Sequence, residues 1–479
     1  MLKKWRSVIA LILAINILFA LVGCQNSADD GQSGEVVDGE AVGDNFFTDN
    51  EVILDDGEKN SDASGDNDDK TQSSANIVGG KTWKQVLAAM PKTLKGSTIT
   101  VYNWNPANEY SGASTVIKKF TKETGIKVKW QTENYDTYIS KLAALVAADT
   151  APDVVRLRTP DSIGLTSIQP ISVTGYDFND DAWDKVLMKD YTINGKTYGV
   201  SLKNTHIGSV SMILYNKSLI SKYDLEDPYQ LWKKGKWTWG KFKEMCRTYK
   251  KESKSEFACG ASEWSAWSTM YGIEGPVGFD GSKYYNRTGD AKFISVSQQI
   301  ADLYNKERIF ADWKSDEFNK GECLFWAGAS VYARRSNAYF AALKTAGTLN
   351  VVPFPTVEGQ DKYYQARDEY EAYGISKGAK NAAAAPYFLR YFLDGSNYDL
   401  KSFFCSNQAL EVYNWCMSQE NTVWTTYYSM NLRFYGGGSD AFNDGYKGLT
   451  GDQFASFLKS NSSVIDARVD KFNKALKDK

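Results

Sequence analysis

"TITVYNWNPANEYSGASTVIKKFTKETGIKVKW", residues 98–130, is the stretch that decides the fold. It opens with the β-rich run Thr98–Trp104 and closes with a second such run, Ile126–Trp130. Between them, four apolar residues follow at i, i+3, i+4 and i+7, which is one face of a helix: Ala113, Val116, Ile117 and Phe120. Gly125 is placed to end that helix in the left-handed conformation. The stretch therefore predicts a strand, a helix and a second strand in succession.

The same pattern continues for another helix and strand. Helical spacing recurs at Ile139, Leu142, Ala143 and Val146, and "DVVRL" (153–157) reads as a third strand. Alternating strands and helices indicate a parallel sheet with right-handed crossovers, and ligands of such sheets bind past the carboxyl ends of the strands. The residues that follow the three strands are therefore candidates for a binding site: Trp104, Asn105, Asn108, Glu109, Glu133, Tyr135, Arg158 and Asp161.

Further along the chain, Thr238 is placed to cap a helix. Trp239, Phe242, Met245 and Tyr249 then share one face, which favours core packing over a binding role.

Composition excludes several classes of protein. The single histidine, His206, excludes a multi-histidine metal centre and argues against histidine-based catalysis. Residues 25–80 carry 15 acidic side chains against 2 lysines, so the net charge of −2 leaves +8 on residues 81–479. Eight charges spread over so long a body, with no basic run, argue against nucleic-acid binding. We expect no cofactor and no enzymatic activity.

The N-terminus carries the marks of export. Positive residues precede a short apolar stretch, Val8–Val22, which is typical of a signal peptide. Leu21-Val22-Gly23-Cys24 resembles the bacterial lipobox, whose cysteine receives two acyl chains and becomes the new N-terminus. Two chains suffice for stable anchoring. An ordinary signal peptide followed by a chance cysteine is the alternative.

Two further features concern the exported chain. Residues 25–80 are rich in Gly, Ser, Asp and Asn, which predicts a disordered acidic tether; Val52–Leu54 is an apolar exception without an assignment. Five cysteines remain after Cys24, an odd number with no CxxC pair, which favours buried unpaired thiols.

An ordered set of motifs carries a family resemblance. "FTKETGIKVKW", "APDVV", "YGVS", "ILYNKSLI", "KWTWGKF", "FNKGECLFWAG", "VVPFPTVEG" and "YGISKGAKNAAAAPYFLRYFL" follow one another in this order. The set resembles the extracellular solute-binding proteins of bacterial ATP-binding-cassette (ABC) importers, in the sugar-binding group that includes maltose-binding proteins. The similarity spans about residues 94–479.

The resemblance implies a two-lobe, type II periplasmic-binding-protein-like α/β fold. Each lobe would be a mainly parallel sheet flanked by helices, with a ligand cleft between them. It also implies the following division: 1–24 signal peptide, 25–80 tether, 81–203 and 355–394 lobe 1, 204–354 and 395–479 lobe 2. A monomer at the outer face of a Gram-positive cell membrane, anchored through Cys24, would deliver a carbohydrate to permease subunits.

Pyranose rings call for flat aromatic side chains against the ring face and for polar side chains around the hydroxyls. Besides Trp104, Asn105, Asn108, Glu109, Arg158 and Asp161, the resemblance implies ligand contacts from Asn204, His206, Glu263, Trp264, Trp267, Trp326, Glu369, Tyr370, Trp415 and Trp424. Trp326 precedes a predicted glycine turn facing the cleft. Within "SEWSAW" (262–267), Glu263 would accept hydroxyls, Trp264 would stack and Trp267 would support it.

The chain departs from the maltose-binding pattern at two positions. Leu157 and Ser330 stand where those proteins carry tryptophans, which argues against maltodextrin as the ligand. A surface glycoside hydrolase, a surface glycan-binding protein without transport, and a binding protein for a non-sugar ligand remain alternatives. "DFNDDAWD" (177–184) lacks the central Gly and terminal Glu of a calcium loop.

Overall fold

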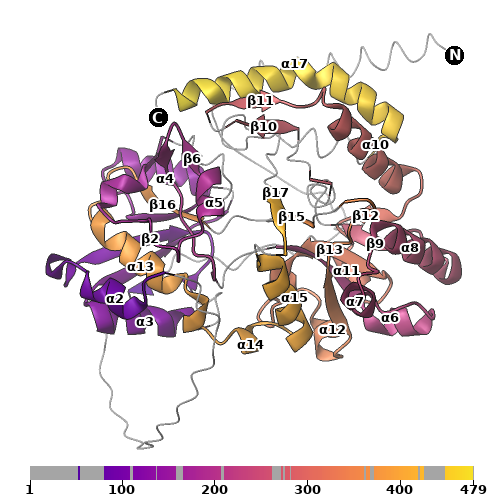
Figure 1. The fold of residues 1–479 in the computed structure, drawn as a ribbon, viewed down its shortest axis with the longest axis horizontal. Coiled ribbons are helices and arrows are strands. Elements are labelled where there is room, and N and C mark those ends of the chain that lie inside the picture. The colour runs from indigo at the N-terminus through magenta and orange to yellow at the C-terminus, as the bar shows by residue number, and fades with distance from the viewer. Residues whose placement is uncertain are drawn as a thin grey trace, which may run out of the picture. The chain divides into compact units, whose positions relative to one another are not determined.

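The computed structural model describes residues 52–53, 80–107, 112–135, 137–157, 166–205, 210–261, 271–272, 276–280, 282–360, 363–366, 372–418, 421–425 and 448–477. Within them the chain forms two larger β-sheets with helices on both faces (Figure 1). The α/β class predicted from the sequence is thereby confirmed.

The first sheet has six strands in the order β1-β3-β2-β4-β16-β5. Its strands are β1 (Val52–Ile53), β2 (Thr98–Asn103), β3 (Lys127–Thr132), β4 (Val154–Leu157), β5 (Ile168–Gln169) and β16 (Ala372–Ser376). β2 pairs in parallel with both β3 and β4, as the strand–helix–strand reading predicted. β16 enters from the second half of the chain and runs antiparallel to β4, so the sheet is mixed rather than mainly parallel.

One element of this sheet was not foreseen. β1 lies inside the segment predicted to be a disordered tether, and it pairs antiparallel with β3 at the edge of the sheet. The apolar exception at Val52–Leu54 thus has a partial assignment as an added edge strand.

The helices around the first sheet include the two that the apolar spacing at 113–120 and 139–146 predicted. They are α2 (Trp83–Ala88), α3 (Ala113–Thr124), α4 (Tyr138–Ala147), α5 (Lys185–Asp190) and α13 (Ala385–Phe392). Gly125 ends α3 at φ 73°, as predicted, and all four apolar residues of the α3 face are buried. The face of α4 differs, because Tyr138 and Leu142 are buried whereas Ala143 is exposed. α2, α3 and α13 pack together, with Phe120 against Phe388 (Figure 1).

The second sheet has five strands in the order β12-β9-β13-β8-β14. These are β8 (Ser211–Asn216), β9 (Cys259–Ala261), β12 (Phe310–Asp312), β13 (Phe325–Ala329) and β14 (Leu349–Pro353). β12, β9 and β13 are parallel, while β8 pairs antiparallel with β13 and β14. The carboxyl ends of the three parallel strands therefore share one edge.

The helices around the second sheet are α6 (Lys217–Lys222), α7 (Pro228–Lys233), α8 (Trp239–Ser253), α10 (Ala291–Asn305), α11 (Ser315–Asn319), α12 (Ala341–Thr345), α14 (Leu400–Phe403), α15 (Asn407–Met417) and α17 (Gly451–Leu476). Thr238 caps α8 by accepting from the Lys241 amide, and the predicted aromatic face of α8 is buried. Both predictions are confirmed. α17 packs along α10 and β11 (Figure 1).

Three two-stranded ribbons complete the described strands: β6 (Thr192–Ile193) with β7 (Lys196–Thr197), β10 (Val277–Phe279) with β11 (Tyr284–Asn286), and β15 (Tyr364–Ala366) with β17 (Val423–Thr425).

The five cysteines after Cys24 are all unpaired, and four of them are buried, as the sequence favoured. No helix within the described ranges is both long enough and apolar enough to cross a membrane.

Candidate ligand-binding site

The carboxyl edge of the first sheet gathers polar and aromatic side chains. Asn103, the last residue of β2, is fully buried, and its amide nitrogen donates to the Tyr373 hydroxyl at 3.1 Å. Its amide oxygen accepts from the Asn105 backbone N–H at 2.9 Å. The Trp130 indole donates to the Asn105 carbonyl at 2.9 Å. Side chains of β2, β3 and β16 thus fix the backbone at Asn105.

Trp104 lies at the same edge and is 6% exposed. Its ring makes edge-to-face contacts with Tyr135 at 5.6 Å and Tyr138 at 5.1 Å. Arg156 places its guanidinium 4.0 Å from the centre of the Trp104 ring, a favourable cation–π contact. The contacts tie the ends of β2 and β4 together.

Arg156 was not among the site residues predicted from the sequence. It lies directly before Leu157 at the end of β4 and is only 2% exposed. A charged residue within an otherwise apolar strand, "DVVRL", was the available signal, because charged residues are rarely fully buried unless they are paired. Its Nη1 lies 3.4 Å from the Asn103 amide oxygen.

Glu133 and Tyr135 follow β3, as predicted. Lys141 binds the Glu133 carboxylate at 2.8 Å. Although burial opposes it, the hydrogen bonds from Lys141, the Asn134 amide and Thr137 lower the pKa of Glu133. Glu133 is therefore an ionised acceptor at neutral pH.

The carboxyl edge of the second sheet carries an exposed aromatic cluster that the sequence analysis also missed. Trp313 follows β12 directly and is 44% exposed, and Tyr339 is 45% exposed. Tyr332 contacts both rings, with its ring centre 6.3 Å from Trp313 and 5.3 Å from Tyr339, and Trp313 and Tyr339 contact each other at 6.3 Å. We call Trp313, Tyr332 and Tyr339 the aromatic platform.

Trp313 has a backbone φ of 39°, in the left-handed region that a bulky side chain rarely adopts. Such strain is found where a fold holds a side chain in a functional position. Asp312, the residue before it, lines a hollow of about 430 Å³ together with Tyr304 and Arg308. An exposed ring held in place at a strand end suits the apolar face of a pyranose ring.

Trp326 differs from its predicted setting. It is 0% exposed and lies inside β13 rather than before a glycine turn. Its ring contacts Trp313 at 5.7 Å and Tyr332 at 4.6 Å, so Trp326 supports the platform from within. Trp415 is partly buried on α15 and contacts Trp232 and Tyr363 edge-to-face.

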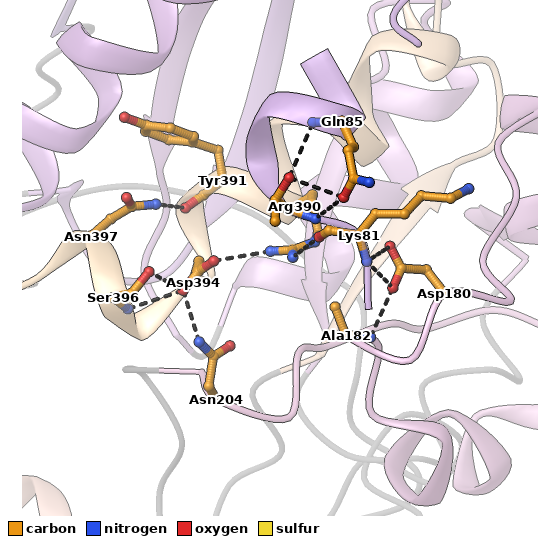
Figure 2. A network of polar contacts seen from close by, with 11 residues as sticks. Lys81, Gln85, Asp180, Ala182, Asn204, Arg390, Tyr391, Asp394, Ser396 and Asn397 are labelled. Atoms are coloured by element: carbon orange, nitrogen blue, oxygen red, sulfur yellow. Dashed lines mark hydrogen bonds and ion pairs between the residues drawn. The ribbon is translucent and has the colours of Figure 1, made fainter. Parts of the chain in front are cut away.

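Asn204 belongs to a polar network rather than to either sheet edge (Figure 2). Its amide donates to Asp394 Oδ1 at 2.8 Å, and its carbonyl accepts from the Gly395 amide at 3.0 Å. Thr205 and Asp394 form a β-bridge, so the segments at 204–205 and 394–395 lie side by side. Arg390 pairs with Asp394 at 3.0 Å and donates to the Lys81 carbonyl at 2.9 Å.

The other predicted site residues lie outside the described residues, or only their backbone is described. The first group comprises Asn108, Glu109, Arg158, Asp161, His206, Glu263, Trp264, Trp267, Glu369 and Tyr370, together with the lipidation residue Cys24; Trp424 belongs to the second. Their roles stay predictions, as do those of Trp104, Asn105, Asn204, Trp326 and Trp415.

The described residues bring no three His, Cys, Asp or Glu side chains together in a group that could hold a metal ion. In "DFNDDAWD" two carboxylates have structural roles instead. Asp184 caps α5, and Asp180 accepts from the Lys81 and Ala182 amides.

This arrangement of two α/β sheets is that of the two-lobe, type II binding proteins. The MalE sugar-binding protein of Xanthomonas citri has a TM-score of 0.59 and 14% identity over 78% of this chain and 98% of that chain. The GacH receptor of Streptomyces glaucescens, solved unliganded and with acarbose, has a TM-score of 0.54 and 17% identity over 80% and 99%. UgpB from Mycobacterium tuberculosis, solved with glycerophosphocholine, has a TM-score of 0.57 and 15% identity over 78% and 99%. The predicted two-lobe fold is confirmed.

The family follows from the sequence itself. Residues 115–400, more than half of the chain, match the profile of the bacterial extracellular solute-binding proteins. The chain belongs to this family, as its motifs predicted. Among curated protein sequences no relative was found.

Proposed function

We propose that this chain captures a carbohydrate, in particular an oligosaccharide, between its two lobes and delivers it to the permease of an ABC importer. The family is one of solute-binding proteins. The observation that carries the sugar assignment is the aromatic platform, which presents two half-exposed rings at the carboxyl edge of the second sheet. Apolar ring faces at a strand-end edge suit the C–H face of a pyranose.

The first sheet supplies the complementary chemistry. The buried Asn103 fixes the backbone at Asn105, and Arg156 and Glu133 add charged groups at the same edge. Amides, guanidinium groups and carboxylates are the groups that hydrogen-bond sugar hydroxyls. A ligand held by both edges would favour the closed arrangement of the lobes through hinge motion.

Calorimetry of the full chain in detergent with a panel of mono- and oligosaccharides tests this proposal. We expect one-to-one binding without release of shorter products. Binding of no saccharide, with binding of a glycerophosphodiester instead, would move the ligand class toward that of UgpB. Appearance of hydrolysis products would point to a glycoside hydrolase.

Membrane attachment through Cys24 is part of the same proposal and is supported by Leu21-Val22-Gly23-Cys24. Cells producing the chain should incorporate an alkyne-labelled fatty acid into it. Cys24→Ser should abolish the label and release the protein into the medium, whereas Cys405→Ser should do neither. Retention of the label in Cys24→Ser would refute the anchor.

A further inference from the structure

Arg334 is a buried cation without a counter-charge among the described residues. It directly follows the 3-10 helix Ser330–Ala333 at the end of β13 and is 5% exposed. Its Nε and Nη2 have no hydrogen-bond partner in the structure. The guanidinium contacts the Phe403 ring at 4.7 Å, and no described carboxylate pairs with it. A buried charge without a partner costs free energy, so a fold that retains one has a use for it.

The position of Arg334 is fixed by a short two-stranded contact. Arg334 forms a β-bridge with Phe404, the Arg335 amide donates to the Phe403 carbonyl, and the Cys405 amide donates to the Ala333 carbonyl. This contact continues the carboxyl end of β13. Ligands of α/β sheets bind at such ends.

Two more cations lie near Cys405, the residue after Phe404, with which Arg334 forms its β-bridge. Arg335 and Lys344 both act electrostatically on the Cys405 thiol. The Lys344 ammonium donates to the Asn337 carbonyl at 2.8 Å, and burial lowers the pKa of Lys344 to about 8. No described carboxylate forms an ion pair with Arg335 or Lys344. Arg334, Arg335 and Lys344 therefore all lie around residues 403–405, and no carboxylate of the described residues pairs with any of them.

Two of the three rings of the aromatic platform, Tyr332 and Tyr339, come from the segment that carries Arg334. Tyr332, two residues before Arg334, contacts Trp313 and Tyr339. The segment after β13 thus carries both ring faces and uncompensated cations. The first suit a sugar ring, and the second suit an anionic substituent.

We propose that Arg334, with Arg335 and Lys344, is a subsite for the anionic group of an acidic saccharide, either the carboxylate of a uronic acid or a phosphate ester. This inference rests on the proposed function and names the class of sugar. A carboxylate or phosphate would supply the acceptors that Arg334 lacks, in the bidentate geometry that guanidinium groups favour. The net charge of +8 on residues 81–479 favours the approach of such a ligand.

Calorimetry of the full chain with matched pairs tests the subsite. One pair is a neutral xylo-oligosaccharide and the same chain bearing a glucuronate; the other is a hexose and its 6-phosphate. At least one acidic member should bind at least about tenfold more tightly than its neutral partner, a difference of about 1.4 kcal/mol. The pair that shows the preference identifies the anion as a carboxylate or a phosphate.

Two variants and a control assign the preference to Arg334. Arg334→Gln should abolish it, and Arg334→Lys should retain only part because the bidentate geometry is lost. Arg247→Gln removes an arginine that is 54% exposed and paired with Glu307, and it should leave the preference intact. Equal affinity for neutral and acidic members in the unaltered chain would overturn the subsite while leaving the proposed function standing. Binding of no saccharide at all would overturn the proposed function itself.

Thermal unfolding separates a binding role from a structural one. Because the buried charge lacks a partner, Arg334→Gln should raise the melting temperature of the ligand-free chain. It should also remove the extra stabilisation that the acidic saccharide gives. A lowered melting temperature with an unchanged preference for acidic saccharides would make Arg334 a structural residue and refute the subsite.

Discussion

Arg390 donates from Nη1 to Asp394 Oδ2 at 3.0 Å, and this ion pair joins three separate parts of the chain (Figure 2). Both side chains are largely buried, at 7% and 16% exposure. Arg390 also holds the Lys81 carbonyl, and Asp394 holds the Asn204 amide. The pair thus connects the backbone at Lys81, the end of α13 and the bridged segments at 204–205 and 394–395.

Asp394→Asn should lower the free energy of unfolding by about 2 kcal/mol, because it leaves the buried Arg390 without its counter-charge. Burial opposes ionisation, but hydrogen bonds from Ser396 and Asn204 and the charge of Arg390 lower the pKa of Asp394. Because the pKa of Asp394 is lower in the folded chain than in the unfolded chain, ionised Asp394 stabilises the fold at pH values above about 3.9, the ordinary pKa of Asp. This stabilisation is lost as the pH falls through the pKa of the folded chain. The difference between variant and parent in urea unfolding should therefore shrink below about pH 4.

Asp149→Asn is the matched control for that experiment. Asp149 pairs with Lys380 at 3.7 Å, but the two side chains are 86% and 66% exposed. Exposed pairs contribute about 0–1 kcal/mol, so this variant should unfold almost as the parent does. Equal losses in the two variants would contradict the role given to Asp394.

Trp313→Ala should weaken binding of a neutral oligosaccharide by at least about tenfold, or about 1.4 kcal/mol, with little change in melting temperature. The ring is 44% exposed, and alanine has a Cβ as tryptophan does, so the strain of the backbone at φ 39° is the same in both. Trp326→Ala should instead lower the free energy of unfolding by about 3–5 kcal/mol, because it leaves a cavity under the platform. Calorimetry and thermal unfolding of both variants measure the two effects. A melting temperature of Trp313→Ala lowered as far as that of Trp326→Ala would give Trp313 a structural role instead.

The sequence predicted the local elements of the first sheet but not which of Trp313 and Trp326 is exposed. β2, α3, β3, α4 and β4 follow from local spacing, because each element buries its own apolar face. "CLFWAGA" is apolar on both faces of its strand, and without alternating polar and apolar residues the sequence could not show that Trp326 points inward.

The platform and the Arg334 subsite could not be predicted for a different reason. Trp313 and Tyr339 stand 26 positions apart, and their rings meet each other and Tyr332 only because β12 and β13 end at the same edge. Arg334 lies in "ARRSN", which reads as an exposed basic loop. Its burial depends on Phe403 and Phe404, which arrive from far along the chain.

Thiol labelling should distinguish Cys405 from the other cysteines of the body. Cys246, Cys259, Cys323 and Cys416 are buried, and burial raises the pKa of each thiol. Burial raises the pKa of the Cys405 thiol as well, so it is the partial accessibility of Cys405 that distinguishes it. In native Cys24→Ser chain, one equivalent should react quickly and four only in denaturant, as measured by mass spectrometry. A negatively charged disulfide reagent should outpace a neutral one at Cys405, given Arg335 and Lys344 beside it; rapid labelling of all five would contradict the described burial.

Lys344 should give the stability curve a slope at alkaline pH. Burial lowers its pKa to about 8, against about 10.4 in the unfolded chain. Between these values the unfolded chain binds more protons, so the stability of the fold rises with pH and the full cost of the buried charge is present below about pH 8. Lys344→Met should therefore be more stable than the parent at pH 7 and lose that advantage by about pH 10.

Loss of the hydrogen bond from Lys344 to the Asn337 carbonyl offsets about 1 kcal/mol of the stability that Lys344→Met gains at pH 7. The test is therefore the pH dependence of that gain and not the size of the gain. The exposed Lys401→Met should leave the slope of the parent unchanged. A saturating acidic saccharide should also remove the slope, because an anion beside Lys344 favours its charged form. Urea unfolding at pH 7, 8.5 and 10, with and without that saccharide, measures all three effects. A slope that persists in Lys344→Met would assign it to another group.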